Sequence, residues 1–300
     1  MELISHNTKF DFMGIAKIPL LLSVLLVAFS IYVWFEQGDS KYGVDFKGGN
    51  EFLVKFTDPT NSEAIRQLLN KSGLDGATVQ AFEGDSNEFS IRIGGEVDSK
   101  SARAKVDSGL TAALSGKYQI VKSDYIGPTI GEELRRKGLI ATVLAMVMIL
   151  AYVSYRFEFA FALGAVLAVF HDVIVATGVY LLAGHQINMG TVAGALTIVG
   201  YSVNDTIVIF DRVREELLKD RHTPISSIFN TAINFTLSRT VVTSLLTLLS
   251  ACALLVLGGG AIRDLSLYLV AGIIAGCYST VFIASPIVVL WEKLRGNKTV

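Results

Sequence analysis

Six long runs of apolar residues set the architecture of the chain. A helix needs about twenty residues to cross about 30 Å of hydrocarbon. Runs of roughly this length lie at residues 16–35, 138–155, 159–183, 187–210, 239–257 and 265–291. Each run predicts a transmembrane helix, and six crossings place both termini on one side. We expect the first helix to be retained, because no small-residue cleavage pattern follows it.

Residues 36–130 have a different pattern, in which short alternating segments are separated by turn residues. The pattern predicts strands at 51–56, 78–82, 89–93 and 118–123, helices at 61–71 and 99–114, and a turn at 84–87. This βαββαβ order is typical of a ferredoxin-like sandwich with two helices on one sheet face. The predicted fold is therefore an all-α six-helix membrane bundle with an inserted α+β ferredoxin-like domain. It divides the chain at residues 1–35, 36–130 and 131–300.

Basic residues in the short loops predict the orientation. Those on one predicted face are Lys9, Lys17, Arg156, Arg212, Arg214, Lys219, Arg221, Lys293, Arg295 and Lys298, and four others, Arg135, Arg136, Lys137 and Arg263, lie on the opposite face. The majority indicates cytoplasmic termini and an extracytoplasmic domain at 36–130. Residues 211–238 are then cytoplasmic. Their interleaved apolar and polar residues predict a helix lying along the membrane interface.

Composition narrows the possible functions. The 300 residues are 51% hydrophobic and 18% charged, whereas soluble domains carry about a quarter charged residues. A net charge of −1 gives no basic surface for nucleic acid. Cys252 and Cys277 lie in apolar runs without the His clustering of a zinc site. The sequence also lacks nucleotide-binding and hydrolase motifs, so we expect no enzymatic activity, no cofactor and an ion gradient as the energy source.

Ionisable side chains inside apolar runs are costly and therefore need a partner or a purpose. Asp205 lies in the fourth run, Arg239 opens the fifth, and His171 and Asp172 lie in the third. If the fourth helix ends near residue 211, Asp205 lies roughly 9 Å inside the boundary, and the long Arg239 side chain reaches a similar depth. The antiparallel neighbours thus predict an Asp205–Arg239 ion pair.

Two interpretations of this pair remain open. It is either a static contact that fixes helix register or a switch in which Asp205 carries a proton and Arg239, which stays charged, responds. For His171 and Asp172, adjacent helical positions point about 100° apart and do not share a face. A structural role and a relay role are equally compatible with that placement.

Several segments together resemble the SecF family. They are residues 42–49 (Tyr-Gly-Val-Asp-Phe-Lys-Gly-Gly), 199–206 (Val-Gly-Tyr-Ser-Val-Asn-Asp-Thr) running on to 210–212 (Phe-Asp-Arg), and 236–240 (Thr-Leu-Ser-Arg-Thr). The His171–Asp172 pair and the junction at 126–128 (Ile-Gly-Pro) also fit. The resemblance extends along essentially the whole chain in the family's order.

The resemblance implies half of an RND-type transporter in a prokaryotic inner membrane. With SecD, such a subunit uses the proton gradient to drive extracytoplasmic movements that assist preprotein translocation and release. The implied partners are SecD, the SecYEG translocon, the preprotein and the lipid bilayer, with YajC and YidC as further candidates. The resemblance also makes Asp205 and Arg239 functional membrane residues. We include Asn204, Asp172 and His171 in the predicted proton pathway.

The segment that follows the first helix is rich in glycine. Gly43, Asp45, Gly48 and Gly49 predict a hinge or a tight junction, because glycine adopts backbone conformations that other residues avoid. Direct contact with substrate is the alternative for this segment. For the whole chain, the alternatives are a stand-alone exporter of small molecules and a scaffold of the translocon that uses no energy.

Overall fold

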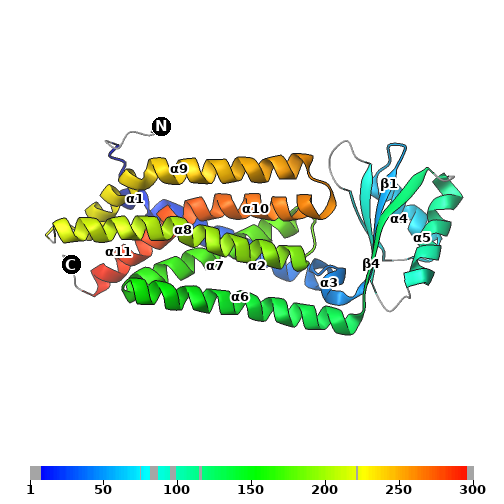
Figure 1. Ribbon diagram of the computed structural model, residues 1–300, viewed down its shortest axis with the longest axis horizontal. Helices are drawn as coiled ribbons and strands as arrows, with labels where there is room; N and C mark the ends of the chain where they lie inside the picture. Colours follow the sequence, from blue (N-terminus) through cyan, green and yellow to red (C-terminus); the bar gives the residue numbers. More distant parts are fainter. Residues whose placement is uncertain are drawn as a thin grey trace.

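The computed structural model describes residues 8–74, 76–81, 87–94, 99–114, 117–220 and 222–295. Residues 82 and 84–86 of the predicted strand and turn, together with Arg221 and Lys298, lie outside these ranges. A long helical bundle forms one part of the elongated molecule, and a small sheet domain sits at one end of it (Figure 1).

Six helical spans in the described chain are long and apolar enough to cross a membrane, which confirms the predicted number. They are α2 (Lys17–Glu36), α6 (Pro128–Arg156), α7 (Phe159–Leu182), α8 (Met189–Lys219), α9 (Ile225–Leu257), and a sixth made of α10 (Gly260–Ser279), the π-helical turn η2 (Thr280–Ala284) and α11 (Ser285–Leu294). A short helix α1 (Phe12–Ile15) precedes α2 at the end of the bundle away from the sheet (Figure 1).

The segment at 211–238 does not form a helix of its own, and its position along the membrane interface stays a prediction. Helix α8 continues to Lys219 and α9 already begins at Ile225. The apolar face of the first turns of α9 is buried in the main core of the bundle, where the Phe229 ring packs at 6.2 Å from that of Phe161 and 6.4 Å from that of Phe210. These turns therefore belong to the same helix as the fifth membrane span and pack against the bundle.

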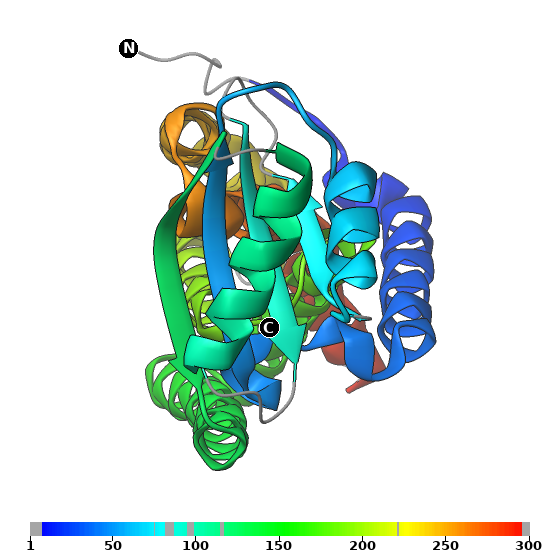
Figure 2. The same ribbon diagram turned by 90° about the vertical axis from the view of Figure 1, so that its right-hand side faces the viewer.

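The sheet domain shows the predicted element order. Its elements are β1 (Gly49–Phe56), α4 (Ser62–Lys71), β2 (Thr78–Ala81), β3 (Glu88–Gly94), α5 (Ser99–Leu114) and β4 (Tyr118–Ile126). The sheet order is β2-β3-β1-β4 with antiparallel neighbours. Helices α4 and α5 lie over one face (Figure 2), where Phe52 and Val54 of β1 pack with Ile65 and Leu69 of α4.

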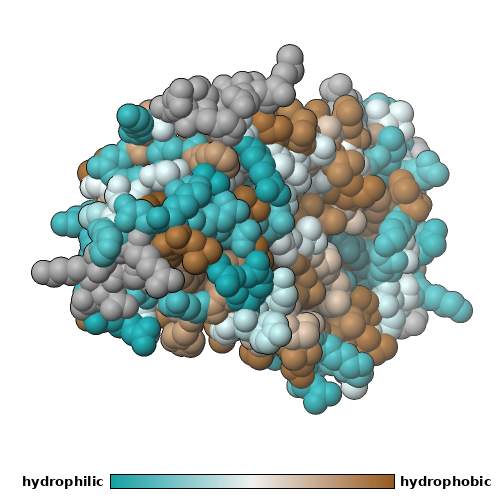
Figure 3. Space-filling view, turned by 60° about the vertical axis from the view of Figure 1, so that its left-hand side comes forward, coloured by the Kyte–Doolittle hydropathy of each residue, from teal (hydrophilic) through white to brown (hydrophobic). Residues whose placement is uncertain are grey.

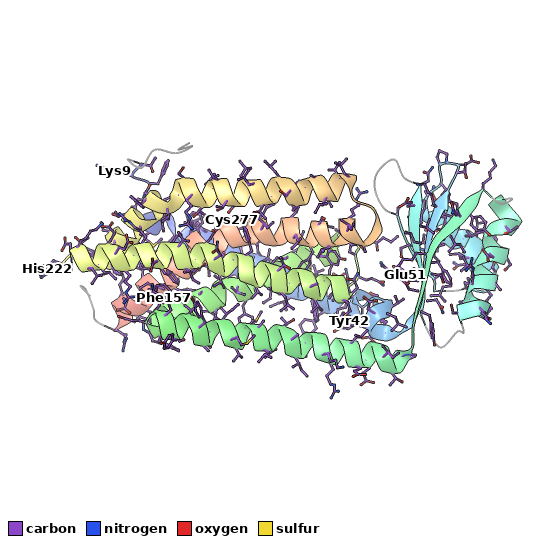
Figure 4. The ribbon with its side chains drawn as sticks, viewed as in Figure 1. Lys9, Tyr42, Glu51, Phe157, His222 and Cys277 are labelled. Carbon is purple, nitrogen blue, oxygen red and sulfur yellow. The ribbon has the colours of Figure 1, made fainter. Side chains whose placement is uncertain are left out.

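The second face of the sheet carries polar side chains and is directed at the bundle. Because side chains alternate along a strand, Glu51 points opposite to Phe52, and it lies on the bundle side of β1 (Figure 4). Figure 4 also places Tyr42 at this end of the bundle and His222 at the far end. The sheet is therefore apolar toward its own helices and polar toward the membrane helices.

The flanks of the bundle expose apolar side chains. Hydrophobic residues spread along the side in Figure 3, while hydrophilic ones gather over the end opposite the sheet domain. On α6 the exposed side chains include Leu139, Ile140, Val143 and Leu144. A contiguous apolar surface of this kind suits contact with hydrocarbon, and the chain is therefore a multi-pass membrane protein.

Candidate functional site

A cluster of polar side chains lies where α7, α8 and α10 meet inside the bundle. Asp172 of α7 is fully buried, and its Oδ2 accepts hydrogen bonds from Ser202 Oγ of α8 at 2.6 Å and Ser279 Oγ of α10 at 2.8 Å. Its Oδ1 lies 2.9 Å from His171 Nδ1. Both oxygens are thus in contact with polar partners, and Asp172 ties three helices together.

His171 and Asp172 were expected to point to different faces, yet both are buried and their side chains meet. The His171 ring stacks on Tyr278, with the ring centroids 6.1 Å apart. The Tyr278 hydroxyl donates to Pro19 O at 2.5 Å and accepts from Ser23 Oγ at 3.1 Å. Adjacent positions still diverge at the backbone, but rotation of the longer imidazole brings Nδ1 back to the carboxylate. The contact extends the cluster to α2.

A second buried carboxylate, Asp205, lies on α8 and is 5% exposed. Its Oδ2 accepts one hydrogen bond, from Ser244 Oγ of α9 at 3.1 Å. Ser202 precedes Asp205 by three residues, so the two carboxylate sites border the same side of α8. Next to Asp205, the Thr206 hydroxyl lies 3.2 Å from that of Thr280. Asp205 therefore has fewer hydrogen-bond partners than Asp172.

The predicted direct ion pair between Asp205 and Arg239 is not present among the described residues. Ser244 stands opposite Asp205, and Arg239 precedes Ser244 by five residues, which is about 7.5 Å along the helix axis. The Arg239 side chain is exposed and lines two open cavities of about 390 and 430 Å³ beside Val208 and Phe235. The register of the long α8 and α9 helices, which local spacing does not set, explains the difference.

Asn204 lies apart from the buried cluster. It is exposed on α8 in line with Thr197 and Gly200, at helical spacings of three and four residues. We call these three residues the α8 stripe. The predicted pathway residues thus form two groups: Asp172, His171 and Asp205 inside the bundle, and Asn204 and Arg239 on its surface.

Sequence reasoning missed the hydroxyl groups that complete the buried cluster. They are Ser202, Thr206, Ser244, Ser279 and Thr280. Their signal was present, because each lies within or beside a span that was already assigned to the membrane, where hydroxyl side chains commonly join helices.

The backbone of the sixth span is irregular beside this cluster. Residues Thr280–Ala284 form a π-helical turn directly after Ser279, and such turns often occur at functional sites. The approach of α10 to α8 is also close. A Cβ on Gly272 would lie 1.9 Å from Ile198 Cδ1, and one on Gly276 would lie 3.3 Å from Ser202 Cβ. The helices that hold Asp172 therefore pack tightly around it.

The glycine-rich segment after α2 forms a tight junction. Gly48 has φ +77° and its Cβ would lie 2.7 Å from Pro128 Cα, whereas Gly49 has φ +138° and its Cβ would lie 2.3 Å from Ile93 O. Gly43 N donates to Ile187 O at 2.9 Å. The Asp45 carboxylate accepts from Met189 N at 2.8 Å, at the N-terminus of α8, where a negative charge is favourable. Movement about this junction stays a prediction.

Comparison with known proteins places this architecture in a family. Residues 106–294 match the family model described as protein export membrane protein SecD/SecF, C-terminal. The protein translocase subunit SecF of Magnetococcus marinus is 41% identical over 297 residues, which cover 97% of this chain and 95% of that protein. The chain belongs to the SecF family. Another relative, the protein translocase subunit SecDF of Thermus thermophilus, is 38% identical over 294 residues, covering 96% of this chain and 39% of SecDF.

Two solved structures of SecDF share the fold of this SecF-family chain. The crystal structure of SecDF, a translocon-associated membrane protein from Thermus thermophilus, aligns with a TM-score of 0.88 at 37% identity, covering 98% of this chain and 40% of SecDF. SecDF in its super-membrane-facing form aligns with a TM-score of 0.72 at 38% identity. This chain therefore agrees more closely in structure with the first of these two SecDF structures.

Proposed function

We propose that this SecF-family chain is a non-enzymatic subunit of the protein-export machinery, works together with SecD, and uses the proton gradient without a cofactor. Membership of the SecF family supports the role in export. The Thermus thermophilus relative carries the joint name SecDF, and this chain spans about 40% of it. In this proposal, SecD supplies membrane helices that complete an RND-type transporter.

The surface of the bundle supports a membrane partner on one side. An amide facing hydrocarbon is costly, yet Asn204 is exposed in the α8 stripe. The exposed guanidinium of Arg239 lies near Asn204 along the bundle axis, and it too is costly in contact with hydrocarbon. SecD therefore covers the α8 stripe and Arg239 in the proposed complex. SecYEG, the preprotein, YajC and YidC are the further partners that the family resemblance implies.

Asp205 is the proposed proton carrier, and the observation that supports it is its single hydrogen bond, from Ser244. A change of charge at Asp205 disturbs fewer contacts than one at Asp172, which is held by Ser202, Ser279 and His171. When Asp205 gains a proton, Arg239 loses its attraction to a nearby anion and α9 shifts. Helix α9 leads into the turn at Gly259, where a Cβ would lie 3.8 Å from Glu88 Oε2 of the sheet domain. This turn offers a route from the membrane charge to the domain.

The proposal includes the placement in a prokaryotic inner membrane. The end of the bundle that carries α1 and α11 is cytoplasmic, in keeping with the excess of basic residues in its loops. The sheet domain is then extracytoplasmic. Its order β2-β3-β1-β4, with two helices on one face, supports a ferredoxin-like class.

The experiment is export of a preprotein into vesicles that contain this chain, SecD and SecYEG. We expect a proton gradient to stimulate export with the wild-type chain and to have no effect with Asp205→Asn, while SecD still co-purifies. The matched control is Asp211→Asn on the same helix, since Asp211 is half exposed and paired with Arg156 at 3.2 Å. Full stimulation with Asp205→Asn would contradict the assignment.

The same assay separates the alternatives. An energy-independent scaffold predicts that Asp205→Asn and Arg239→Gln leave export unchanged. A stand-alone exporter of small molecules predicts that neither SecD nor SecYEG co-purifies from native membranes in mild detergent. Loss of stimulation together with intact co-purification supports the proposal over both.

A further inference from the structure

A second polar cluster joins the sheet domain to the outer end of the bundle. From the sheet, Arg92 of β3 is 7% exposed and its Nε donates to Glu51 Oε1 of β1 at 2.8 Å. From the bundle, Asp264 of α10 is 8% exposed, and its Oδ2 lies 3.9 Å from Arg92 Nη2. His185, in the loop between α7 and α8, lies between the two groups. The cluster therefore holds two parts of the molecule together through buried charges.

One nitrogen atom of His185 has two competing neighbours. Its Nδ1 lies 2.6 Å from Gln80 Nε2 on β2 and 2.9 Å from Asp264 Oδ1 on α10. The amide of Gln80 can only donate from Nε2, so that contact needs Nδ1 without a proton. The carboxylate of Asp264 can only accept, so that contact needs Nδ1 with a proton. The two contacts cannot both be hydrogen bonds at the same time.

The orientation of Gln80 is fixed by Arg92. Arg92 Nη1 donates to Gln80 Oε1 at 2.9 Å and to Gln186 Oε1 at 3.3 Å, so the NH₂ group of Gln80 is turned toward His185. A proton on Nδ1 would face this NH₂ group directly. Neutral His185 therefore carries its proton on Nε2 and accepts from the sheet domain. In that state Asp264 Oδ1 is buried without a hydrogen-bond donor among the described residues.

Uptake of a proton by His185 reverses these contacts. Nδ1–H then donates to Asp264 Oδ1 within the bundle, and Gln80 of the sheet domain loses its acceptor. The new positive charge offsets that of Asp264, which weakens the attraction of Asp264 for Arg92. It also repels Arg92, since both groups contact Gln80. All three changes reduce the contact between the sheet domain and the bundle.

The other charged and titratable groups around His185 do not replace it. The Tyr180 ring of α7 stacks on the imidazole at 4.9 Å. Glu51 accepts from Arg92 and from Ser90 Oγ at 2.6 Å, so it keeps Arg92 paired within the sheet domain after release. The remaining charged groups on the adjoining strands are Glu88 of β3, paired with Lys55, and Lys122 and Asp124 of β4, paired with each other.

We propose that His185 is a proton-operated latch, which holds the sheet domain against the bundle when neutral and releases it when charged. If the sheet domain is extracytoplasmic, it is released by acid on that side of the membrane. Only this assignment of the domain to one side of the membrane rests on the proposed function. The latch is separate from Asp205, because its atoms lie at the outer end of α7 and α10.

The test is the distance between spin labels on the full chain in lipid nanodiscs. Lys105 of α5 and Leu139 of α6 are exposed and take the labels as cysteines, with Cys252 and Cys277 replaced by alanine. We expect a longer or broader distance distribution at about pH 5.5 than at about pH 8, because histidine side chains change charge between about pH 5 and 8. No change in this labelled, otherwise wild-type chain would overturn the proposal.

Variants assign the change to the latch. His185→Gln keeps an acceptor for Gln80 but cannot gain a proton, so the short distance should persist at both pH values. Gln80→Ala removes the sheet-domain partner, and the longer distance should appear at both. The matched control His222→Gln, at the far end of the bundle (Figure 4), should keep the wild-type response. A wild-type pH response in His185→Gln would overturn the latch.

A further variant separates this inference from the proposed proton carrier. Asp205→Asn should keep the wild-type distance change, because the latch responds to protons at His185. If Asp205→Asn removes the change while His185→Gln keeps it, Asp205 governs the domain and the latch is wrong. The opposite result is also possible: the distance change depends on His185, but a proton gradient does not stimulate export. In that case the latch stands and the proposed function is wrong.

Discussion

Three membrane spans of this protein are packed inside the bundle, and three lie on its outside. In the most apolar part of each helix, 61% of residues are buried in α7, 61% in the α10–α11 span and 50% in α8, against 17% in each of α2, α6 and α9. Hydropathy does not separate the two groups, since α7 and α9 have nearly equal values of 2.2 and 2.3. Buried carboxylates do, because Asp172, Asp205 and Asp264 all belong to inner helices. The polar residues of an apolar span therefore indicate which helices form the centre.

The largest loss of stability should come from removing the Asp172 carboxylate from the buried polar cluster. Asp172→Ala removes the carboxylate that Ser202, Ser279 and His171 contact, and a buried polar group left without its partner costs about 1–3 kcal/mol of unfolding free energy. Chemical unfolding in detergent measures it. Asp172→Asn, which keeps an acceptor, should lose less, and Asp211→Ala, at a half-exposed position, should lose only about 0.5 kcal/mol. Equal losses for Asp172→Ala and Asp211→Ala would break the comparison.

A smaller effect should follow from crowding the inner helices. Gly272→Ala places a Cβ against Ile198 on α8, and overpacking of this kind costs about 1–3 kcal/mol. The matched control is Gly200→Ala on the outward side of α8, where a Cβ meets nothing within 4 Å. The control should be neutral or gain up to about 1 kcal/mol from helix propensity. The same unfolding assay compares them, and a destabilised Gly200→Ala with a neutral Gly272→Ala would reverse the account.

A substitution on the exposed surface of the bundle should change the binding of SecD and leave the unfolding free energy of the chain nearly unchanged. Asn204→Leu makes the α8 stripe more compatible with lipid, so the unfolding free energy of the chain alone should change little. Binding to SecD should weaken by about 1 kcal/mol, the scale of one polar contact between membrane helices. Quantitative co-purification measures this change. Leu144→Ala on α6 serves as the control, and equal binding by both variants would remove the α8 stripe from the proposed interface.

The smallest expected effect is the loss of the stability that the solvent-exposed carboxylate of Asp220 contributes. Hydrogen bonds from the Thr223 hydroxyl and the His222 N–H hold the pKa of Asp220 below its ordinary value of about 3.9. A carboxylate whose pKa is lowered in the folded state stabilises the fold at pH values above its pKa in the unfolded chain. This stability is lost as the pH falls through the pKa of the folded state. Asp220→Asn should therefore unfold at a slightly lower temperature at pH 7, and the difference should fade below about pH 3.9. A difference that grows toward acid would contradict the sign.

The sequence predicts those features that depend on local periodicity. Apolar runs located the six membrane spans, and alternation within residues 36–130 indicated the strands and helices of the sheet domain. The predictions from the sequence failed where segments that are far apart in the chain come into contact. Arg239 stands beside Val208 and not in contact with Asp205, because the packing of two long helices sets their register. The hydroxyls of Ser202 and Ser279 became part of the site only when three helices brought them to Asp172.

The junction and the latch show the same limit in the sheet domain. Glycines at 48 and 49 indicate unusual backbone, but the sequence does not show that Pro128 and Ile93 leave no room for a side chain there. His185, Gln80 and Asp264 come from three segments far apart in the chain, and no spacing among them predicts contact. Only the sheet resting on the bundle brings them together.

The most direct test of the account is infrared detection of protonated carboxyl groups in the membrane-embedded chain during a pH titration. The account predicts a carboxylic-acid band that changes with pH, is lost in Asp205→Asn and persists in Asp172→Asn, because Asp205 exchanges its proton while Asp172 holds the inner helices together. A band that still titrates in Asp205→Asn, and disappears in Asp172→Asn, would contradict the assignment of Asp205 as the proton carrier.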